Sequence, residues 1–192
     1  MGPPPPYEAI VDACRGPDSR VDRSRLLTAL LEAWAAAYDP GGRASALHEV
    51  PIDSVTYLFD YASSRCLPQE DRVVAAVGES VAAVSPRDSS YQRRHPRPFP
   101  RGGRAVDKGH LVPHSGGGVL HVNLFPQDRA LNRGWSAEGR IYRSMEREIA
   151  IPGTFFFCRL LYDDDSWFPR TVELGLLRAD VLVARRFRNR FD

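Results

Sequence analysis

Lysine is almost missing from this chain. Of its 26 basic residues, 25 are arginine, and Lys108 is the only lysine. Such a bias commonly reflects codon composition. Lys108 nevertheless lies inside the stretch of the sequence that most resembles a functional motif. This position indicates that the site requires the compact charge of an ammonium group rather than the planar guanidinium of arginine. The formal net charge is only +2, so overall charge does not by itself identify a nucleic-acid-binding protein.

Cysteine is also scarce. The three cysteines, Cys14, Cys66 and Cys158, are widely spaced and form no C-x-x-C pair. An odd number at this spacing argues against a disulfide framework and against a zinc site. It fits a reducing compartment in which the thiols are buried.

Long apolar runs and targeting signals are missing as well. No apolar stretch approaches the ~20 residues that a transmembrane helix needs. The first residues, M-G-P-P-P-P-Y-E, have neither a basic region nor an apolar core of the kind that signal peptides carry. We therefore expect a cytoplasmic protein without a membrane partner, while delivery as a toxin stays open.

The hydrophobic patterns predict an α+β fold with a mainly antiparallel sheet. Apolar residues at helical spacing predict helices over residues 7–13, 22–38, 68–84 and 137–150. Runs of β-branched and aromatic residues predict strands over 55–61, 154–162, 171–177 and 181–186, with extended pieces at 109–112 and 119–124. The organisation expected is an N-terminal helical extension over residues 1–50 and a second domain over 51–192, or one continuous domain.

A stretch rich in arginine and proline, residues 85–103, has no periodicity and is expected to be a long functional loop. Between residues 93 and 108 the only acidic residue is Asp107. The same region contains six basic residues: Arg93, Arg94, Arg97, Arg101, Arg104 and Lys108. Such a local patch can supply phosphate contacts without a high net charge. Three nearby aromatic side chains could stack on bases or pack in the core: Tyr91, Phe99 and Trp135.

Most of the chemistry is concentrated between Val106 and Glu146. The segment reads D-K-G-H at residues 107–110 and N-x-x-P-Q at 123–127, followed by Asn132 and by Glu146 on a predicted helix. An imidazole with a pKa near ~6.5 can act as a base at neutral pH. An amide oxygen suits Mg²⁺, which prefers oxygen ligands and keeps several waters.

This segment resembles the DNA/RNA non-specific endonuclease family, the ββα-metal nucleases whose signature is D-R-G-H, then N-x-x-P-Q, a second Asn and a Glu. The resemblance covers residues 95–178 and implies a ββα-metal site. It makes His110 the general base, Asn132 the metal ligand and Glu146 a catalytic or metal-binding carboxylate, with Mg²⁺ or Mn²⁺ as cofactor. It gives Asn123 a supporting catalytic role. The family's arginine is Lys108 here, which would meet the scissile phosphate; further phosphate contacts are expected from Arg104, Arg133 and Arg143.

Two alternatives to these assignments can be compared with the sequence. The gap between Asn132 and Glu146 is six residues longer than the family pattern, so Glu138 or Glu148 could take the carboxylate role. An HNH-type nuclease would need a second histidine ligand on the helix, and residues 132–150 contain none. His114 and His121 fall off the motif and are expected to be structural or at the rim.

The sequence therefore predicts a metal-dependent endonuclease that acts on DNA, and possibly RNA, with little sequence specificity. Its role could be that of a toxin or a defence effector. The alternative is a nuclease fold that has lost catalysis and serves as a nucleic-acid-binding module. An unspecific cytoplasmic nuclease must be restrained, so we expect an inhibitory, immunity or sensor protein as partner, bound through the first ninety residues. The oligomeric state is left open.

Overall fold

All eight strands of the protein's computed structural model pair in antiparallel fashion, within the part of the chain that it describes: residues 5–38, 47–61, 71–83, 106–119, 122–164 and 166–191. The strands are β1 (Leu47–Ile52), β2 (Val55–Asp60), β3 (Arg72–Glu79), β4 (Val106–His110), β5 (Leu124–Asp128), β6 (Phe155–Leu161), β7 (Thr171–Arg178) and β8 (Val181–Arg188). The helices are α1 (Tyr7–Ala13), α2 (Arg23–Tyr38), α4 (Arg129–Arg133) and α5 (Ala137–Ile149), with a short 3₁₀ helix η3 (His114–Gly116). The predicted α+β class with a mainly antiparallel sheet is confirmed.

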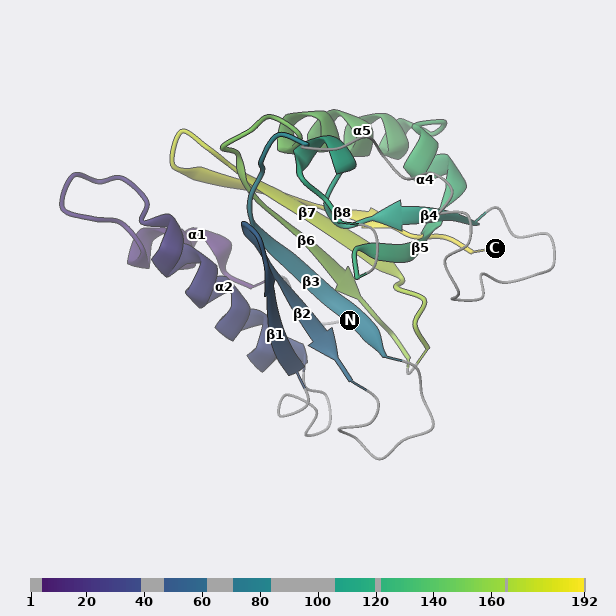
Figure 1. Ribbon diagram of the computed structural model, residues 1–192, viewed down its shortest axis with the longest axis horizontal. Coiled ribbons are helices and arrows are strands. Elements are labelled where there is room, and N and C mark those ends of the chain that lie inside the picture. Colours follow the sequence, from purple (N-terminus) through teal and green to yellow (C-terminus); the bar gives the residue numbers. More distant parts are fainter. Residues whose placement is uncertain are drawn as a thin grey trace.

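Six strands form the main sheet in the order β1-β2-β3-β6-β7-β8, and β4 pairs with β5 in a separate small sheet. Figure 1 shows α1 and α2 on one side of the main sheet, with α4, α5 and the β4–β5 pair on the other. The sheet is therefore covered on both faces, as its apolar strands require.

Helices α1 and α2 share a core with one face of the main sheet. Leu30 and Trp34 of α2 are fully buried against a cluster that includes Val74 and Phe157. Their four-residue spacing places them on the same side of the helix. The helix predicted over residues 22–38 is confirmed, and the boundary expected at residue 50 falls inside β1.

The opposite face carries the candidate site. Tyr142 and Met145 of α5 and Phe125 of β5 are buried in one cluster with Phe156 and Leu174 of the main sheet. The alternation of Phe156, Cys158 and Leu160 on this side with Phe155 and Phe157 on the other follows the two-residue period of a strand. Packing on the sheet thus fixes α5 beside the β4–β5 pair.

The helix predicted over residues 68–84 is wrong, because residues 72–79 form strand β3. The valines at four-residue spacing suggested a helix, but β3 lies inside the sheet between β2 and β6. Val73 packs in the core on one side, and Val74 and Val77 pack in the core on the other. A strand buried on both faces reads as a continuous apolar run, which periodicity does not distinguish from a buried helix.

The remaining elements follow the predictions with four differences. Strand β1 and helix α4 were not predicted. The extended piece expected at 109–112 lies earlier, as β4 over residues 106–110, and the one expected at 119–124 lies later, as β5 over residues 124–128. The loop at 85–103, with its cations and aromatic residues, lies outside the described residues, as does His121. No helix among the described residues is long and apolar enough to cross a membrane.

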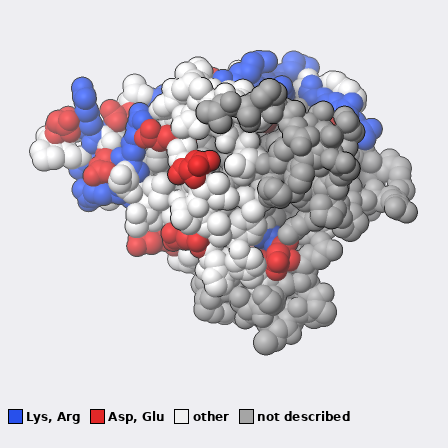
Figure 2. Space-filling view, viewed as in Figure 1, with Lys and Arg blue, Asp and Glu red and all other residues white. Residues whose placement is uncertain are grey.

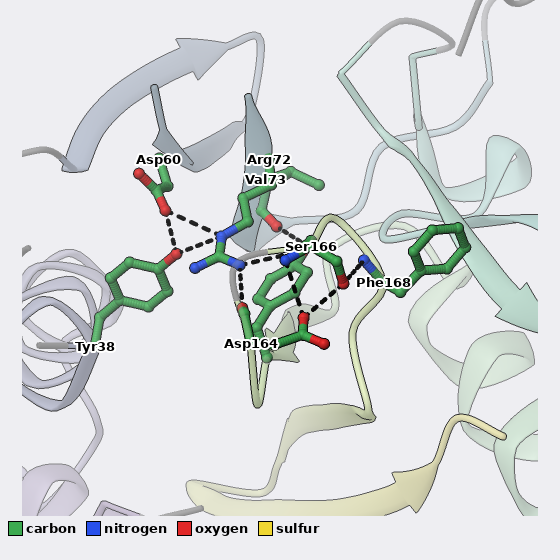
Figure 3. Close-up of polar contacts among 8 residues, drawn as sticks. Tyr38, Asp60, Arg72, Val73, Asp164, Ser166 and Phe168 are labelled. Atoms are coloured by element: carbon green, nitrogen blue, oxygen red, sulfur yellow. Dashed lines mark hydrogen bonds and ion pairs between the residues drawn. The ribbon is translucent and has the colours of Figure 1, made fainter. Parts of the chain in front are cut away.

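A buried ion pair between Arg72 and Asp60 connects the main sheet to neighbouring segments away from the candidate site. The Arg72 guanidinium donates through Nε to Asp60 Oδ2 at 3.0 Å and to the Tyr38 hydroxyl at 2.7 Å. Its Nη1 donates to the carbonyl oxygens of Asp164 and Ser166 at 2.7 and 2.8 Å (Figure 3). One side chain at the start of β3 therefore joins β2, the end of α2 and the segment that leads into β7.

Candidate functional site

A cavity of about 940 Å³ opens between β4, η3, α4 and α5. Ten residues line it: Asp107, Lys108, His110, Pro113, His114, Ser115, Asn132, Arg133, Arg143 and Glu146. Six of these were predicted as site residues from the sequence, and they come from three separate elements. The fold therefore brings an imidazole, an amide, a carboxylate and several cations together in one cavity.

Strand β4 supplies the first two predicted residues. Lys108 and His110 are two positions apart, so they project from the same side of the strand. Both are half-buried and line the cavity. Burial lowers the pKa of the Lys108 ammonium. Strand pairing of β4 with β5, with His110 opposite Leu124, fixes where the imidazole leaves the backbone.

Asn123 holds the chain immediately after His110. Its Oδ1 accepts from the backbone N–H of Val112 and its Nδ2 donates to the carbonyl of the same residue, both at 2.8 Å. The side chain is fully buried and does not line the cavity. Asn123, which the sequence placed among the catalytic residues, is therefore positioned to support the backbone beside the site rather than to touch a substrate.

Gly109 allows β4 to approach a second buried amide. A Cβ at this position would lie 2.3 Å from Gln127 Oε1 and 2.7 Å from Gln127 Cβ. The Gln127 side chain is fully buried, so it has little room to move. Only glycine fits between Lys108 and His110 at this separation of the strands.

We expect Gly109→Ala to lower the free energy of unfolding by about 1–3 kcal/mol, because the added methyl overpacks a buried contact. Urea denaturation measures the change. The matched control is Gly16→Ala, where the new Cβ would meet the exposed Asp18 side chain at 3.2 Å and the Arg20 carbonyl oxygen at 3.7 Å, an ordinary contact distance. Equal effects of the two substitutions would contradict the close approach of β4 to Gln127.

Asp107 connects β4 to helix α4. Its carboxylate accepts from Asn132 Nδ2 at 3.1 Å, from Arg129 Nε at 3.1 Å, and from Arg133 Nε and Nη2 at 2.7 and 3.0 Å. Burial raises the pKa of Asp107, but the hydrogen bonds from Arg133, Asn132 and Arg129 outweigh it, and the pKa lies below the usual range. The carboxylate is thus ionised and holds three side chains of α4 at once.

The hydrogen bond from Asn132 to Asp107 determines which side-chain atom of Asn132 can contact a ligand. Because Nδ2 donates to the carboxylate, the amide oxygen is the atom left for other contacts. Helix α4 itself is fixed at both ends, by the Asp128 side chain accepting from Ala130 N–H and by Gly134 at φ 72°. Asn132 therefore sits on a short, well-capped helix with its orientation set.

Among the described residues that line the cavity, Glu146 supplies the one buried carboxylate. It is 7% exposed and accepts from Arg143 Nη1 at 2.6 Å. Burial raises the pKa of Glu146, and Arg143 and Arg147 partly offset this. Of the alternatives, Glu148 is paired with Arg178, and neither Glu148 nor Glu138 lines the cavity.

The raised pKa of Glu146 has a consequence for stability. A raised carboxyl pKa contributes stability below the unfolded pKa of about 4.3, and this contribution is lost as pH rises through the folded pKa. We expect Glu146→Gln to raise the free energy of unfolding at pH 7 by roughly 0.5–1 kcal/mol, because it removes a buried charge. Urea denaturation in EDTA at pH 7 and pH 4 tests this. A loss of stability at pH 7, or the same gain at pH 4, would contradict it.

The oxygen donors of the cavity suit a small divalent cation. Asn132 presents an amide oxygen and Glu146 a carboxylate, both of which are ligands that Mg²⁺ accepts. Among the described residues, no group of three or more His, Cys, Asp or Glu side chains forms a metal cluster. A cation at this cavity would therefore depend on an amide, one carboxylate and water.

Basic side chains gather around the cavity. Figure 2 shows Lys and Arg along the upper edge of the molecule, where Figure 1 places α4 and α5. Arg133 and Arg143, which were predicted to contact phosphate, line the cavity but already pair with Asp107 and Glu146. Arg104, the third predicted arginine, lies outside the described residues.

Sequence reasoning missed two contributors to the site. His114, expected to be structural or at the rim, lines the cavity from η3. Arg129 helps to hold Asp107. Neither residue belongs to the motif, and only the position of η3 and α4 against β4 reveals them.

A scan of protein-family models finds no match to this chain, and a comparison with curated proteins finds none either.

Proposed function

We propose that the chain is a metal-dependent endonuclease that hydrolyses phosphodiester bonds in DNA or RNA. The observation that carries the proposal is the convergence of Lys108, His110, Asn132 and Glu146 on one cavity. These four come from β4, α4 and α5, so the sequence motif corresponds to a group of neighbours in space. A base, a phosphate-binding cation and oxygen ligands for a metal are the parts that phosphodiester hydrolysis requires.

His110 acts as the general base in this proposal. An imidazole nitrogen takes a proton from the attacking water as the new oxygen–phosphorus bond forms, and the bond to the departing oxygen breaks. Asn123 and the β4–β5 pairing hold the backbone on either side of His110. Lys108, on the same side of β4, neutralises charge on the phosphate.

Asn132 and Glu146 would hold the cation, Mg²⁺ or Mn²⁺. A bound divalent ion supplies charge neutralisation for the phosphate and the departing oxygen. Asp107 contributes by keeping the Asn132 nitrogen occupied, so that the amide oxygen is available. Arg143 contributes by holding the Glu146 carboxylate at 2.6 Å.

Digestion of plasmid DNA and of a structured RNA with the full chain tests the proposal. We expect cleavage with Mg²⁺ or Mn²⁺, no cleavage with EDTA, and little preference for sequence at the cut sites. Nucleic acid that is bound but left intact under all metal conditions would refute the nuclease and support the binding-module alternative. The ratio of DNA to RNA cleavage gives the substrate preference.

A further inference from the structure

Trp135 is the most exposed large hydrophobic side chain among the described residues. Its relative exposure is 64%, whereas Trp34 is fully buried and Trp167 is 9% exposed. Tryptophan gains stability by burying a large apolar area. A ring fixed in solvent therefore indicates a surface that binds a ligand or another molecule. The sequence left open whether this ring packs in the core or stacks on bases, and its exposure rules out core packing.

The backbone around the ring is fixed. Trp135 lies between Gly134, which ends α4 at φ 72°, and Ser136, whose side chain caps α5 by accepting from Gly139 N–H. The Trp135 N–H donates to the carbonyl of Ala130 at 2.9 Å. The indole is therefore carried by a rigid connection between two helices.

Helix capping does not account for the indole. A hydrophobic residue before an N-cap often packs against the fourth residue of the helix. Here Ser136 is the N-cap of α5, and the corresponding residue is the exposed Arg140. The apolar ring thus has no apolar staple partner in its own helix.

The ring lies beside the cavity and is covered on one face. The Arg133 guanidinium sits 5.1 Å from the centroid of the indole, and Arg133 also lines the cavity. Two hydrogen bonds to Asp107 hold that guanidinium in place. The chain Asp107–Arg133–Trp135 fixes the orientation of the ring while most of its surface stays open.

We propose that Trp135 is a stacking platform for an unpaired nucleobase next to the phosphate bound in the cavity. Aromatic rings beside basic grooves bind single strands in this way, because every base offers a π face. The paired bases of a duplex are already stacked, so the platform favours single-stranded or frayed nucleic acid. The nucleotide nature of the ligand rests on the proposed function.

Tryptophan fluorescence reads this site selectively, because the other two tryptophans are buried. The full chain in EDTA is titrated with a ten-nucleotide oligothymidine, with oligouridine, and with an abasic phosphodiester of the same length. We expect both base-containing oligonucleotides to quench the emission and the abasic strand to leave it unchanged. Because thymidine and uridine differ in the 5-methyl group as well as in the sugar, an oligodeoxyuridine of the same length shows whether the sugar, and so DNA or RNA, affects the quenching.

Substitutions separate stacking from simple apolar contact. We expect Trp135→Ala to weaken oligothymidine binding about 5- to 100-fold, measured by anisotropy, with unchanged affinity for the abasic strand. Trp135→Phe should restore most of the affinity because it keeps an aromatic face, and Trp135→Leu should behave like alanine. Circular dichroism checks that each variant keeps the fold, which an exposed side chain should allow.

The outcomes distinguish this proposal from the nuclease proposal. Equal binding of oligothymidine by the wild type and Trp135→Ala, or no binding of any strand, overturns the platform even if plasmid is cleaved. Base-dependent quenching at Trp135 without cleavage under any metal condition supports the platform and refutes the nuclease.

Discussion

His110→Ala is expected to lower the rate of metal-dependent DNA cleavage by about 10²- to 10⁴-fold, the contribution typical of a positioned general base. His110 is half-buried at the end of β4 and lines the cavity, so removal of its imidazole leaves the backbone and the neighbouring side chains in place. Nucleic-acid binding in EDTA should change little, because Lys108 and the arginines remain. The measurement is a time course of plasmid digestion under saturating Mg²⁺.

His114→Ala is the matched control for this prediction. His114 lines the same cavity from η3 but lies outside the motif, so its loss should reduce the rate far less. Both variants are checked by thermal unfolding, so that a loss of activity is not mistaken for a loss of fold. Equal cleavage by the wild type and His110→Ala would remove His110 from the mechanism, and an equal loss from both histidines would leave the base unassigned.

Arg72→Ala is expected to lower the free energy of unfolding by about 3–5 kcal/mol, because it leaves the Asp60 carboxylate buried without its main counter-charge. Arg72 is 3% exposed and Asp60 is fully buried. The substitution also removes the donor to the Asp164 and Ser166 carbonyls. Urea denaturation with a common slope for both proteins gives the difference.

An exposed ion pair between α2 and the end of the same strand, β3, provides the control. Arg23 and Glu79 meet at 2.9 Å with side chains 46% and 44% exposed, and Arg23→Ala should cost no more than about 1 kcal/mol. The double variant Arg72→Ala/Asp60→Ala should cost less than the sum of the two single changes, since the second substitution removes the stranded charge. If Arg72→Ala lowered the free energy of unfolding by less than about 1 kcal/mol, the contacts of Arg72 with Asp60 and its neighbours would not stabilise the sheet.

Much of the fold could be predicted because residue type adds to spacing: the consecutive Phe155, Phe156 and Phe157 of β6 favour a strand although both faces of that strand are buried. In α5, the helical spacing of Ile141, Met145 and Ile149 predicted the helix; Met145 and Ile149 are buried, whereas Ile141 is 40% exposed and its neighbour Tyr142 is buried instead. Strand β3 was predicted as a helix because apolar residues on both of its faces remove the two-residue alternation that identifies a strand. β1 escaped prediction because its residues alternate weakly and include Pro51.

For the candidate site, the sequence could predict which residues come together but not how they are held. Lys108, His110, Asn132 and Glu146 were chosen by motif and chemistry, and they do share a cavity. The bonds of Asp107 to α4, and of Asn123 to the Val112 backbone, join segments whose separation depends on the register of β4 and β5. No local pattern specifies such contacts, because the partners meet only after the strands pair.

The single lysine gives this molecule a chemical handle that few proteins have. Amine-directed reagents react with the neutral form of an amine, and burial lowers the pKa of Lys108, which favours that form. Apart from the chain terminus, every such label must therefore go to the wall of the cavity. Acylation of the intact protein thus reports occupancy of one pocket directly by mass, and any ligand that fills the pocket should slow the labelling.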